Sequence, residues 1–143
     1  MKIVSIATSK KKGTRKQQVN EAELIKDHGL KGDGHAGKWH RQVSFLSYEN
    51  IQKAKEQGLD VSFGDFAENI ATTGIDWKTI TVGTRIGLGE SVIVEITQTG
   101  KKCHKKCALY YQAGDCIMPK EGVFARVLTG GKISCGDAIE IKV

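Results

Sequence analysis

Three short β-rich segments separated by glycine make up residues 80–97, ITVGTRIGLGESVIVEIT. In the last segment Val92, Val94 and Ile96 alternate with Ile93 and Glu95, which is the period-two pattern of a strand that buries one face. We therefore expect strands at residues 80–82, 85–88 and 91–97, joined by tight glycine turns.

The same pattern of short strands continues on both sides of this run. Further strands are predicted at residues 1–8, 41–46, 123–128, 132–134 and 138–143, with Gly130 and Gly131 as a tight hairpin turn. Ser47 is a helix N-cap and Gly58 the matching stop signal, and residues 102–112 can form a second helix. Residues 21–27 fit a strand or a helical turn, and residues 63–73 read as irregular or helical. These elements predict a mainly β fold, a β-barrel with a few short helices.

Length and composition indicate one globular domain over residues 1–143. The chain is 39% hydrophobic and 27% charged, which excludes the composition of a disordered protein. The apolar run near the N-terminus, residues 3–7, is too short for a signal peptide or a membrane span. We therefore expect a cytoplasmic protein with no membrane partner, whose four cysteines are thiols, ligands or nucleophiles.

The positive charge is concentrated in two places. The chain carries 22 Lys and Arg against 16 Asp and Glu, and nine of these bases lie at residues 10–16 and 101–106. Local patches favour an anionic ligand, although the first patch also fits a solvated loop. Aromatic residues are only 6% and do not alternate with the bases, so a nucleic-acid partner is poorly supported.

Four glycines occur within residues 29–37, followed closely by Arg41. Such a segment is expected to be a loop in which His35 can approach a ligand closely. Asp33 could orient the His35 ring or cap a turn, and the planar fork of Arg41 suits a phosphate or carboxylate. A purely structural glycine turn with a capping Asp33 is the alternative interpretation.

A second polar group, Asp65, Glu68 and Asn69, lies within GDFAENI, residues 64–70. Asp65 and Glu68 are three residues apart, so a helix would place them on one face. A paired acid and base role is one interpretation, and helix capping or the wall of a pocket is the more common one.

The third group places two cysteines among lysines, in GKKCHKKC, residues 100–107. Positive neighbours favour the thiolate form of Cys103, which is both the nucleophilic and the metal-binding form. Cys107 lies one helical turn further and is a candidate second ligand. The spacing of the four cysteines, C-x3-C-x8-C-x18-C, matches structural zinc sites poorly, so zinc is the weaker alternative.

Together these motifs resemble the MOSC domain, the C-terminal module of molybdenum cofactor sulfurases, in its short stand-alone form. The resemblance runs nearly end to end and in the family's order. It rests on residues 29–37, Arg41-Gln42-Val43-Ser44, residues 64–70, Val82-Gly83, Cys103, residues 122–127 and Gly136-Asp137. Two departures concern pocket geometry: Lys102 stands where many members have Pro, and Ala67 where many have Gly.

The resemblance implies a MOSC-like β-barrel that binds molybdenum cofactor (molybdopterin) or a precursor, with Cys103 as molybdenum ligand or persulfide carrier. The cofactor carries a terminal phosphate, for which the bases are candidates. The candidate site residues are Cys103 and His35 for chemistry, Cys103 and Cys107 for metal, and Asp33, Arg41, Glu68, Asn69, Lys101, Lys102 and Arg126 for cofactor binding. A sulfur-donor protein or a molybdoenzyme is the expected partner. A small molybdenum-dependent reductase of N-hydroxylated compounds is the alternative function, and a zinc or nucleic-acid-binding module is a weaker one.

Overall fold

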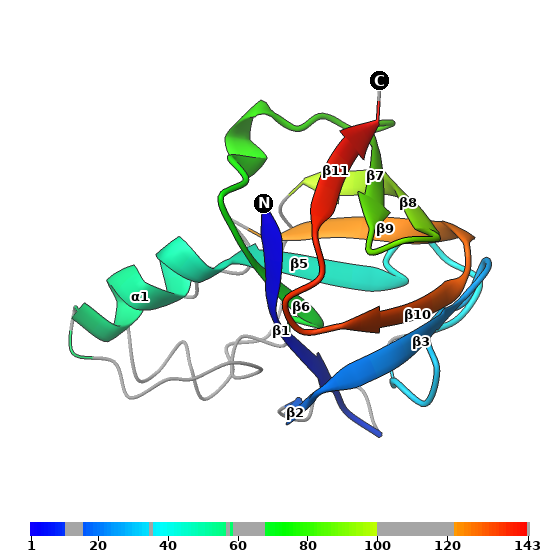
Figure 1. Cartoon of the computed structure of the whole chain (residues 1–143), viewed down its shortest axis with the longest axis horizontal. Coiled ribbons are helices and arrows are strands. Elements are labelled where there is room, and N and C mark those ends of the chain that lie inside the picture. The colour runs from blue at the N-terminus through cyan, green and yellow to red at the C-terminus, as the bar shows by residue number, and fades with distance from the viewer. Residues whose placement is uncertain (11–15, 35, 57, 59–67, 100–121, 143) are drawn as a thin grey trace.

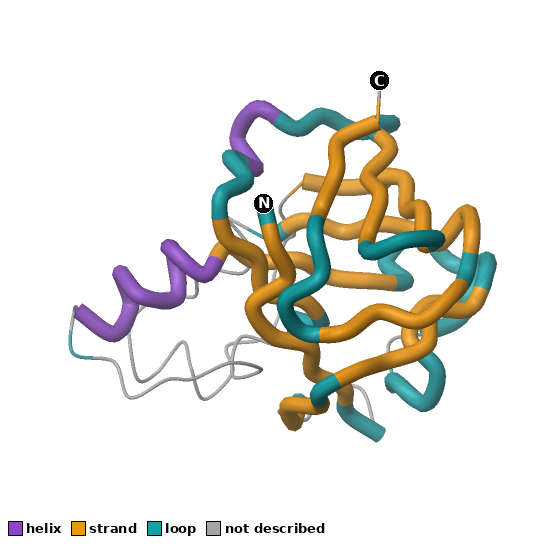
Figure 2. The backbone as a smooth tube through the Cα atoms, viewed as in Figure 1, coloured by secondary structure: helices purple, strands orange, loops and turns teal. Residues whose placement is uncertain are grey.

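The computed structural model describes residues 1–10, 16–34, 36–56, 58, 68–99 and 122–142 (Figure 1). Short strands dominate these residues (Figure 2), which confirms the mainly β class. The strands and helices, in chain order, are β1 Lys2–Thr8, β2 Gln17–Val19, β3 Glu21–Ile25, β4 Gly29–Leu30, β5 Val43–Ser47, α1 Tyr48–Glu56, β6 Ile70–Thr73, the 3-10 helix η1 Trp77–Thr79, β7 Arg85–Leu88, β8 Val92–Thr99, β9 Val123–Thr129, β10 Gly131–Ser134 and β11 Ile139–Lys142. None of the described helices is long and apolar enough to cross a membrane.

Eight strands form one curled sheet in the order β11-β7-β8-β9-β5-β6-β1-β2, and β10-β3-β4 form a smaller sheet. All pairs are antiparallel except β5 with β6. The edge strand β11 meets β1, the strand next to the opposite edge, where the backbone N–H of Ile3 donates to the Asp137 carbonyl at 2.9 Å and that of Ile139 donates to the Met1 carbonyl at 3.0 Å. In the described chain this closure is an isolated bridge rather than a continuous ladder.

The core is built from the inward faces of the strands predicted by alternation. Val92, Val94 and Ile96 of β8 are at most 1% exposed. They join Phe45 of β5 and Ile86 of β7 in a single cluster of buried apolar side chains. One face of β8 is buried in the core and the other is not, and this difference is why apolar residues recur at every second position of the strand.

Helix α1 begins and ends where the sequence predicts. The Ser47 hydroxyl accepts a hydrogen bond from the backbone N–H of Asn50 at 3.3 Å, as an N-cap does. Gly58 has a φ of +91° and donates its N–H to the Lys55 carbonyl at 3.0 Å. A positive φ favours glycine, which explains the stop at this residue.

Two local predictions are wrong. Residues 80–82 are not a strand: Ile80 caps η1 and Val82 lies in a turn with 62% of its surface exposed. Gly130 and Gly131 do not form a hairpin, because β10 pairs with β3 and not with β9. A Cβ at Gly130 would lie 2.6 Å from the Leu24 carbonyl oxygen, so glycine here allows the chain to cross closely over β3.

Three further segments became strands. The open choice at residues 21–27 resolves to β3, and residues 70–73, expected to be irregular or helical, form β6. The glycine-rich loop starts with the two-residue strand β4. Pairing with strands far along the chain, β10 and β1, decides the conformation of β3 and β6, whereas β4 pairs with the neighbouring β3. The predicted helix at residues 102–112 lies outside the described residues.

Asp137 forms the turn that precedes β11 and closes the sheet. Its carboxylate accepts a hydrogen bond from the backbone N–H of Ser134 at 2.8 Å. Asp137→Ala is therefore expected to lower the free energy of unfolding by roughly 0.5–2 kcal/mol, the usual cost of losing such a cap. Urea unfolding measures this loss, and ligand affinity per folded molecule should stay unchanged. A selective loss of ligand affinity would contradict a structural role.

Candidate functional site

The face of β8, β9 and β5 that points away from the core carries polar side chains. Gln98 of β8 and Ser44 of β5 both pair with Phe124 of β9, so the three residues form one row across the sheet. Two pairs further along, Glu95 lies opposite Arg126. Because cross-strand partners share a face, these residues lie on one side of the sheet, with Ser44 and Phe124 buried and Arg126 exposed.

Arg41 lies on this surface, just before β5. Its Nε donates to the Gln98 side-chain oxygen at 2.9 Å, and its guanidinium carbon lies 5.3 Å from the centre of the Phe124 ring. A cation over an aromatic face is held by the ring quadrupole. Within the described chain no carboxylate pairs with Arg41. The guanidinium group predicted to bind an anion is thus oriented by neutral groups, and no acid of the described residues offsets its positive charge.

The predicted reactive cysteine lies outside the described residues, as do His35, Lys101, Lys102 and Cys107. The attachment points of its segment are nevertheless described, because Thr99 at the end of β8 pairs with Val123 at the start of β9. Cys103 is four residues beyond Thr99, and an extended chain spans at most about 14 Å over that distance. Chain connectivity therefore limits Cys103 to within about 14 Å of Thr99.

Arg126 takes part in a small charge cluster on the same surface. Its Nη2 lies 2.9 Å from Glu95 Oε1, and Arg85 Nε lies 3.7 Å from Glu95 Oε2. About half of the Arg126 side chain remains exposed. Two arginines share one carboxylate, so the cluster stays net positive and can attract an anion.

A hollow of about 550 Å³ opens beside this cluster. Trp39 and His40 pack edge to face at 5.7 Å, and the ring Nε2 of His40 lies 3.0 Å from the Gln98 side-chain oxygen that Arg41 also contacts. Sequence reasoning missed Lys38 and Trp39. Their position in the sequence, between the glycine-rich loop and Arg41, could have marked them as candidates for the same site. The lining residues are Asp27, Lys38, Trp39, His40, Val82, Glu95, Thr97 and Arg126.

Asp33 lies elsewhere, in a buried ion pair with Lys16. The Lys16 Nζ is 2.7 Å from Asp33 Oδ1, and both side chains are 0% exposed. The same oxygen accepts the backbone N–H of Ser9 at 3.0 Å. Burial raises the pKa of Asp33, but hydrogen bonds from Lys16 and Ser9 outweigh it, so the pKa lies below its ordinary value. These contacts favour the structural interpretation of Asp33, and they remove Lys16 from the solvated basic patch.

Asn69 and Glu68 are buried as well, at 1% and 0% exposure. The Asn69 side-chain oxygen accepts the backbone N–H of Ser44 at 3.0 Å, and its amide nitrogen donates to the Ala7 carbonyl at 3.1 Å. Asn69 therefore ties β5 to β1 at the start of β6. Neither residue lines the hollow beside Arg126.

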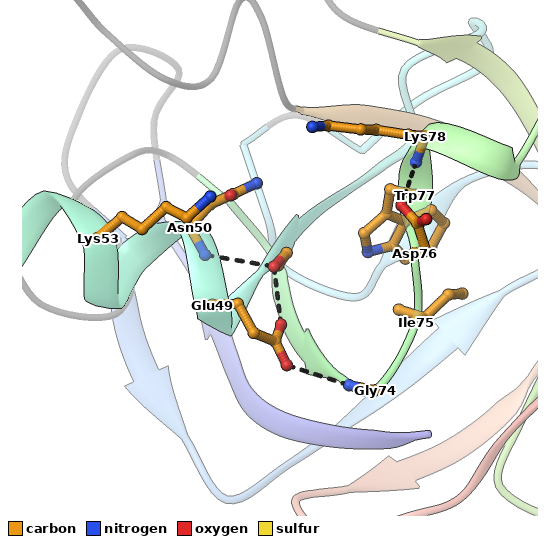
Figure 3. Close-up of a pocket in the computed structure, with 9 residues that line it drawn as sticks. Glu49, Asn50, Lys53, Gly74, Ile75, Asp76, Trp77 and Lys78 are labelled. Carbon is orange, nitrogen blue, oxygen red and sulfur yellow. Dashed lines mark hydrogen bonds between the residues drawn. The ribbon is translucent and has the colours of Figure 1, made fainter.

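A second concavity, of about 390 Å³, lies between α1 and the loop that leads into η1 (Figure 3). Glu49 forms part of its wall and is held firmly in place. Its Oε1 accepts from the Thr73 hydroxyl at 2.7 Å and the Gly74 N–H at 3.2 Å, and its Oε2 accepts from the Ser47 hydroxyl at 2.8 Å. The lining residues are Ser47, Glu49, Asn50, Lys53, Gly74, Ile75, Asp76, Trp77 and Lys78.

These contacts of Glu49 predict an acid dependence of stability. Burial opposes its ionisation, but the hydrogen bonds from Thr73 and Ser47 prevail and lower its pKa from 4.5 to about 2. A carboxyl group with a depressed pKa stabilises the fold above pH 4.5, and this contribution is lost as the pH falls toward 2. Urea unfolding across this range should show a smaller pH dependence for Glu49→Gln than for the wild type. Equal pH dependence of the two proteins would contradict this role.

Within the described residues no group of three or more His, Cys, Asp or Glu side chains could hold a metal ion. Of the four cysteines only Cys135 is described. It is exposed, and its sulfur lies 3.7 Å from the Val19 carbonyl oxygen. The alternative of a zinc site depends on the cysteines and histidine of residues 103–116, which lie outside the described residues.

Solved structures of similar fold cover almost the whole chain. The YuaD protein from Bacillus subtilis matches with a TM-score of 0.80 at 18% identity, over 98% of this chain and 94% of that one. YiiM from Escherichia coli matches with a TM-score of 0.70 at 23% identity, over 100% and 70% of the two chains. YiiM from Geobacillus stearothermophilus matches with a TM-score of 0.73 at 20% identity, over 99% and 75%.

No curated protein sequence matches the chain. The sequence model of the MOSC domain matches residues 32–140, which is most of the chain and includes residues 32–37 of the glycine-rich loop, Arg41, Cys103 and Asp137. The chain therefore belongs to the MOSC domain family, which is associated with molybdenum cofactor-related functions.

Proposed function

We propose that this protein binds molybdenum cofactor or a precursor of it on the outer face of β8, β9 and β5, with Cys103 as the molybdenum ligand or persulfide carrier. The observation that carries the proposal is the pairing of Thr99 with Val123. It tethers the Cys103 segment to the surface on which Arg41 lies with no carboxylate partner among the described residues.

The residues present suit the chemistry of the cofactor. Its terminal phosphate matches the fork of Arg41 and the net positive cluster around Arg126. Lys101 and Lys102 adjoin the cysteine and add two further positive charges. A cysteine thiolate is a soft donor that suits molybdenum, and Cys107 is the candidate second ligand. The hollow beside Trp39 and His40 offers an aromatic wall to a planar ring system.

The direct test is the metal and pterin content of protein purified from a host that makes the cofactor, grown with molybdate. We expect molybdenum and pterin in equal amounts, and neither in protein from a host that lacks cofactor synthesis. Protein from the competent host that contains neither molybdenum, pterin nor persulfide would overturn the proposal. Turnover of an N-hydroxylated compound with a supplied reductant would indicate the reductase instead.

Arg41→Ala is expected to weaken cofactor retention while the protein stays folded. Loss of one charge-assisted contact to a phosphate should cost about 1.5–3 kcal/mol of binding free energy. The matched control is Lys132→Ala, which removes the same charge from a lysine of the small sheet that is 70% exposed. If both variants retain cofactor equally well, Arg41 does not contact the ligand.

A further inference from the structure

Strand β8 departs from regular pairing near its end, at Thr97. Ile96 pairs with Ala125 and Gln98 pairs with Phe124, so Thr97 is an extra residue between two consecutive pairs. Such a β-bulge redirects the side chains around it. In a regular strand the side chains of Thr97 and Gln98 would point to opposite faces of the sheet. The bulge therefore allows two successive side chains of β8 to contact one neighbouring segment.

That segment is residues 40–41, which precede β5. The Thr97 hydroxyl donates a hydrogen bond to the His40 carbonyl oxygen. The Gln98 side-chain oxygen contacts two groups at once, Arg41 Nε at 2.9 Å and His40 Nε2 at 3.0 Å. One amide oxygen of β8 thus joins the two side chains that follow the glycine-rich loop.

The shared oxygen determines which nitrogen of the His40 ring carries a proton. The Arg41 guanidinium can only donate, so the Gln98 amide has to present its oxygen, and not its nitrogen, at this position. An amide oxygen can only accept, and His40 Nε2 is therefore the donor. In a neutral imidazole the other nitrogen, here Nδ1, is then an acceptor. No group of the described residues bonds to this Nδ1.

Further contacts hold both side chains in place. The His40 ring packs edge to face against Trp39 at 5.7 Å and lines the hollow of about 550 Å³. The Arg41 guanidinium lies over the Phe124 ring, and among the described residues only its Nε forms a hydrogen bond. Arg41 and His40 thus present the four terminal N–H groups of a guanidinium beside a single acceptor nitrogen.

We propose that Gln98 is a positioning residue of the ligand site, a role that rests on the function proposed above. Its side-chain oxygen aligns the guanidinium of Arg41 and fixes the tautomer of His40 with Nδ1 as the acceptor. The site then selects a ligand that carries an anionic oxygen for Arg41 and an N–H or O–H donor for His40. A pterin that bears a phosphate combines both kinds of group in one molecule.

The first test uses protein from a host that lacks cofactor synthesis, so its outcome does not depend on the proposed function. Nitrogen NMR of the imidazole groups at about pH 8, where an ordinary histidine is neutral, shows which ring nitrogen is protonated. His40→Gln protein assigns the signals of His40. We expect the proton on Nε2, exchanging slowly with water because it is hydrogen-bonded. Gln98→Leu removes the acceptor and should abolish the slowly exchanging proton, whereas Gln98→Glu keeps an acceptor oxygen and should retain it.

Two results of this test would overturn the role of Gln98. One is a wild-type protein with the proton on Nδ1 of His40, and the other is the same slowly exchanging proton in wild-type and Gln98→Leu protein. The matched control is Gln18→Leu, which makes the same change on the exposed strand β2 and should leave the His40 signals unchanged.

The second test measures how fast bound cofactor is lost in dialysis from protein made in a cofactor-competent host. Gln98→Leu should lose it about fivefold to tenfold faster than the wild type, the usual effect of one missing hydrogen bond. Gln98→Glu should also lose it faster although its NMR signal is retained, because the new carboxylate neutralises Arg41. His40→Gln can still donate to Gln98 but lacks Nδ1, and it should weaken retention by a similar factor.

Equal rates of loss from wild-type and Gln98→Leu protein would contradict the positioning role. Gln18→Leu is again the control and should match the wild type. A wild-type protein that holds no cofactor would refute the proposed function, and the NMR comparison would then still decide whether Gln98 orients His40. Failure of the proposed function is thereby distinguished from failure of this inference.

Discussion

Replacement of Lys16 by Met is expected to cause the largest loss of stability of any single substitution considered for this protein. Lys16 and Asp33 are both completely buried, 2.7 Å apart. Removal of the ammonium leaves a carboxylate inside the protein without its main counter-charge, which typically costs about 3–5 kcal/mol. Urea unfolding of wild-type and Lys16→Met protein measures the difference.

The double variant Lys16→Met/Asp33→Leu tests the physical reason. Because both charges then disappear, most of the lost stability should return, as found for buried ion pairs replaced by apolar groups of similar size. The matched control is Lys10→Met, an exposed lysine of the same basic stretch, which should change stability by less than about 0.5 kcal/mol. Equal stability of Lys10→Met and Lys16→Met would refute the buried-pair account.

The Lys16 pair also affects the proposed site. Asp33 lies in the glycine-rich loop two residues before His35, and the Gly34 N–H donates to the Ser9 carbonyl at 2.6 Å. Lys16 thus anchors the loop to the end of β1 through Asp33 and Ser9. Hydrogen exchange of residues 28–40 should accelerate in Lys16→Met protein under conditions in which it remains folded.

Cys103→Ser is expected to have the largest effect on function: complete loss of bound molybdenum or persulfide in a protein that stays folded. A serine hydroxyl can neither carry sulfur nor replace a thiolate as a soft ligand. Elemental analysis, persulfide determination and a melting curve on the same preparation give the three quantities needed. The surrounding lysines should also make Cys103 the first thiol to react with an alkylating agent near neutral pH.

The controls for this experiment are the other cysteines. Cys135→Ser should keep full cofactor content, because Cys135 lies exposed in the turn before β11 and its thiol donates a hydrogen bond to the Val19 carbonyl oxygen. Cys107→Ser distinguishes one thiolate from two, since a second ligand would reduce retention without abolishing it. Full molybdenum content in Cys103→Ser protein, or preferential alkylation of Cys107, would show that the assignment of Cys103 is wrong.

Features with a short sequence range were predictable from the sequence. The alternation of residues 92–96 specified β8, and Ser47 and Gly58 set the ends of α1. Each depends on contacts within a few residues or on a repeat that one strand displays by itself. The order of the motifs along the chain also identified the family, because motifs can be compared without knowing which segments contact one another.

Features that depend on a distant partner were decided only by the tertiary structure. In the sequence Lys16 is one more base of a stretch expected to be exposed. In the structure it is buried and forms an ion pair with Asp33, 17 residues away. The sequence around Gly130 predicts a hairpin turn. In the structure β3 lies directly against Gly130, and β10 pairs with β3 instead of with β9. Arg41 acquires its orientation from Gln98 and Phe124, more than 50 residues further along the chain. Local periodicity indicates which face of a strand is apolar. Which acid pairs with a base, and which strand pairs with another, depends on how the whole chain packs.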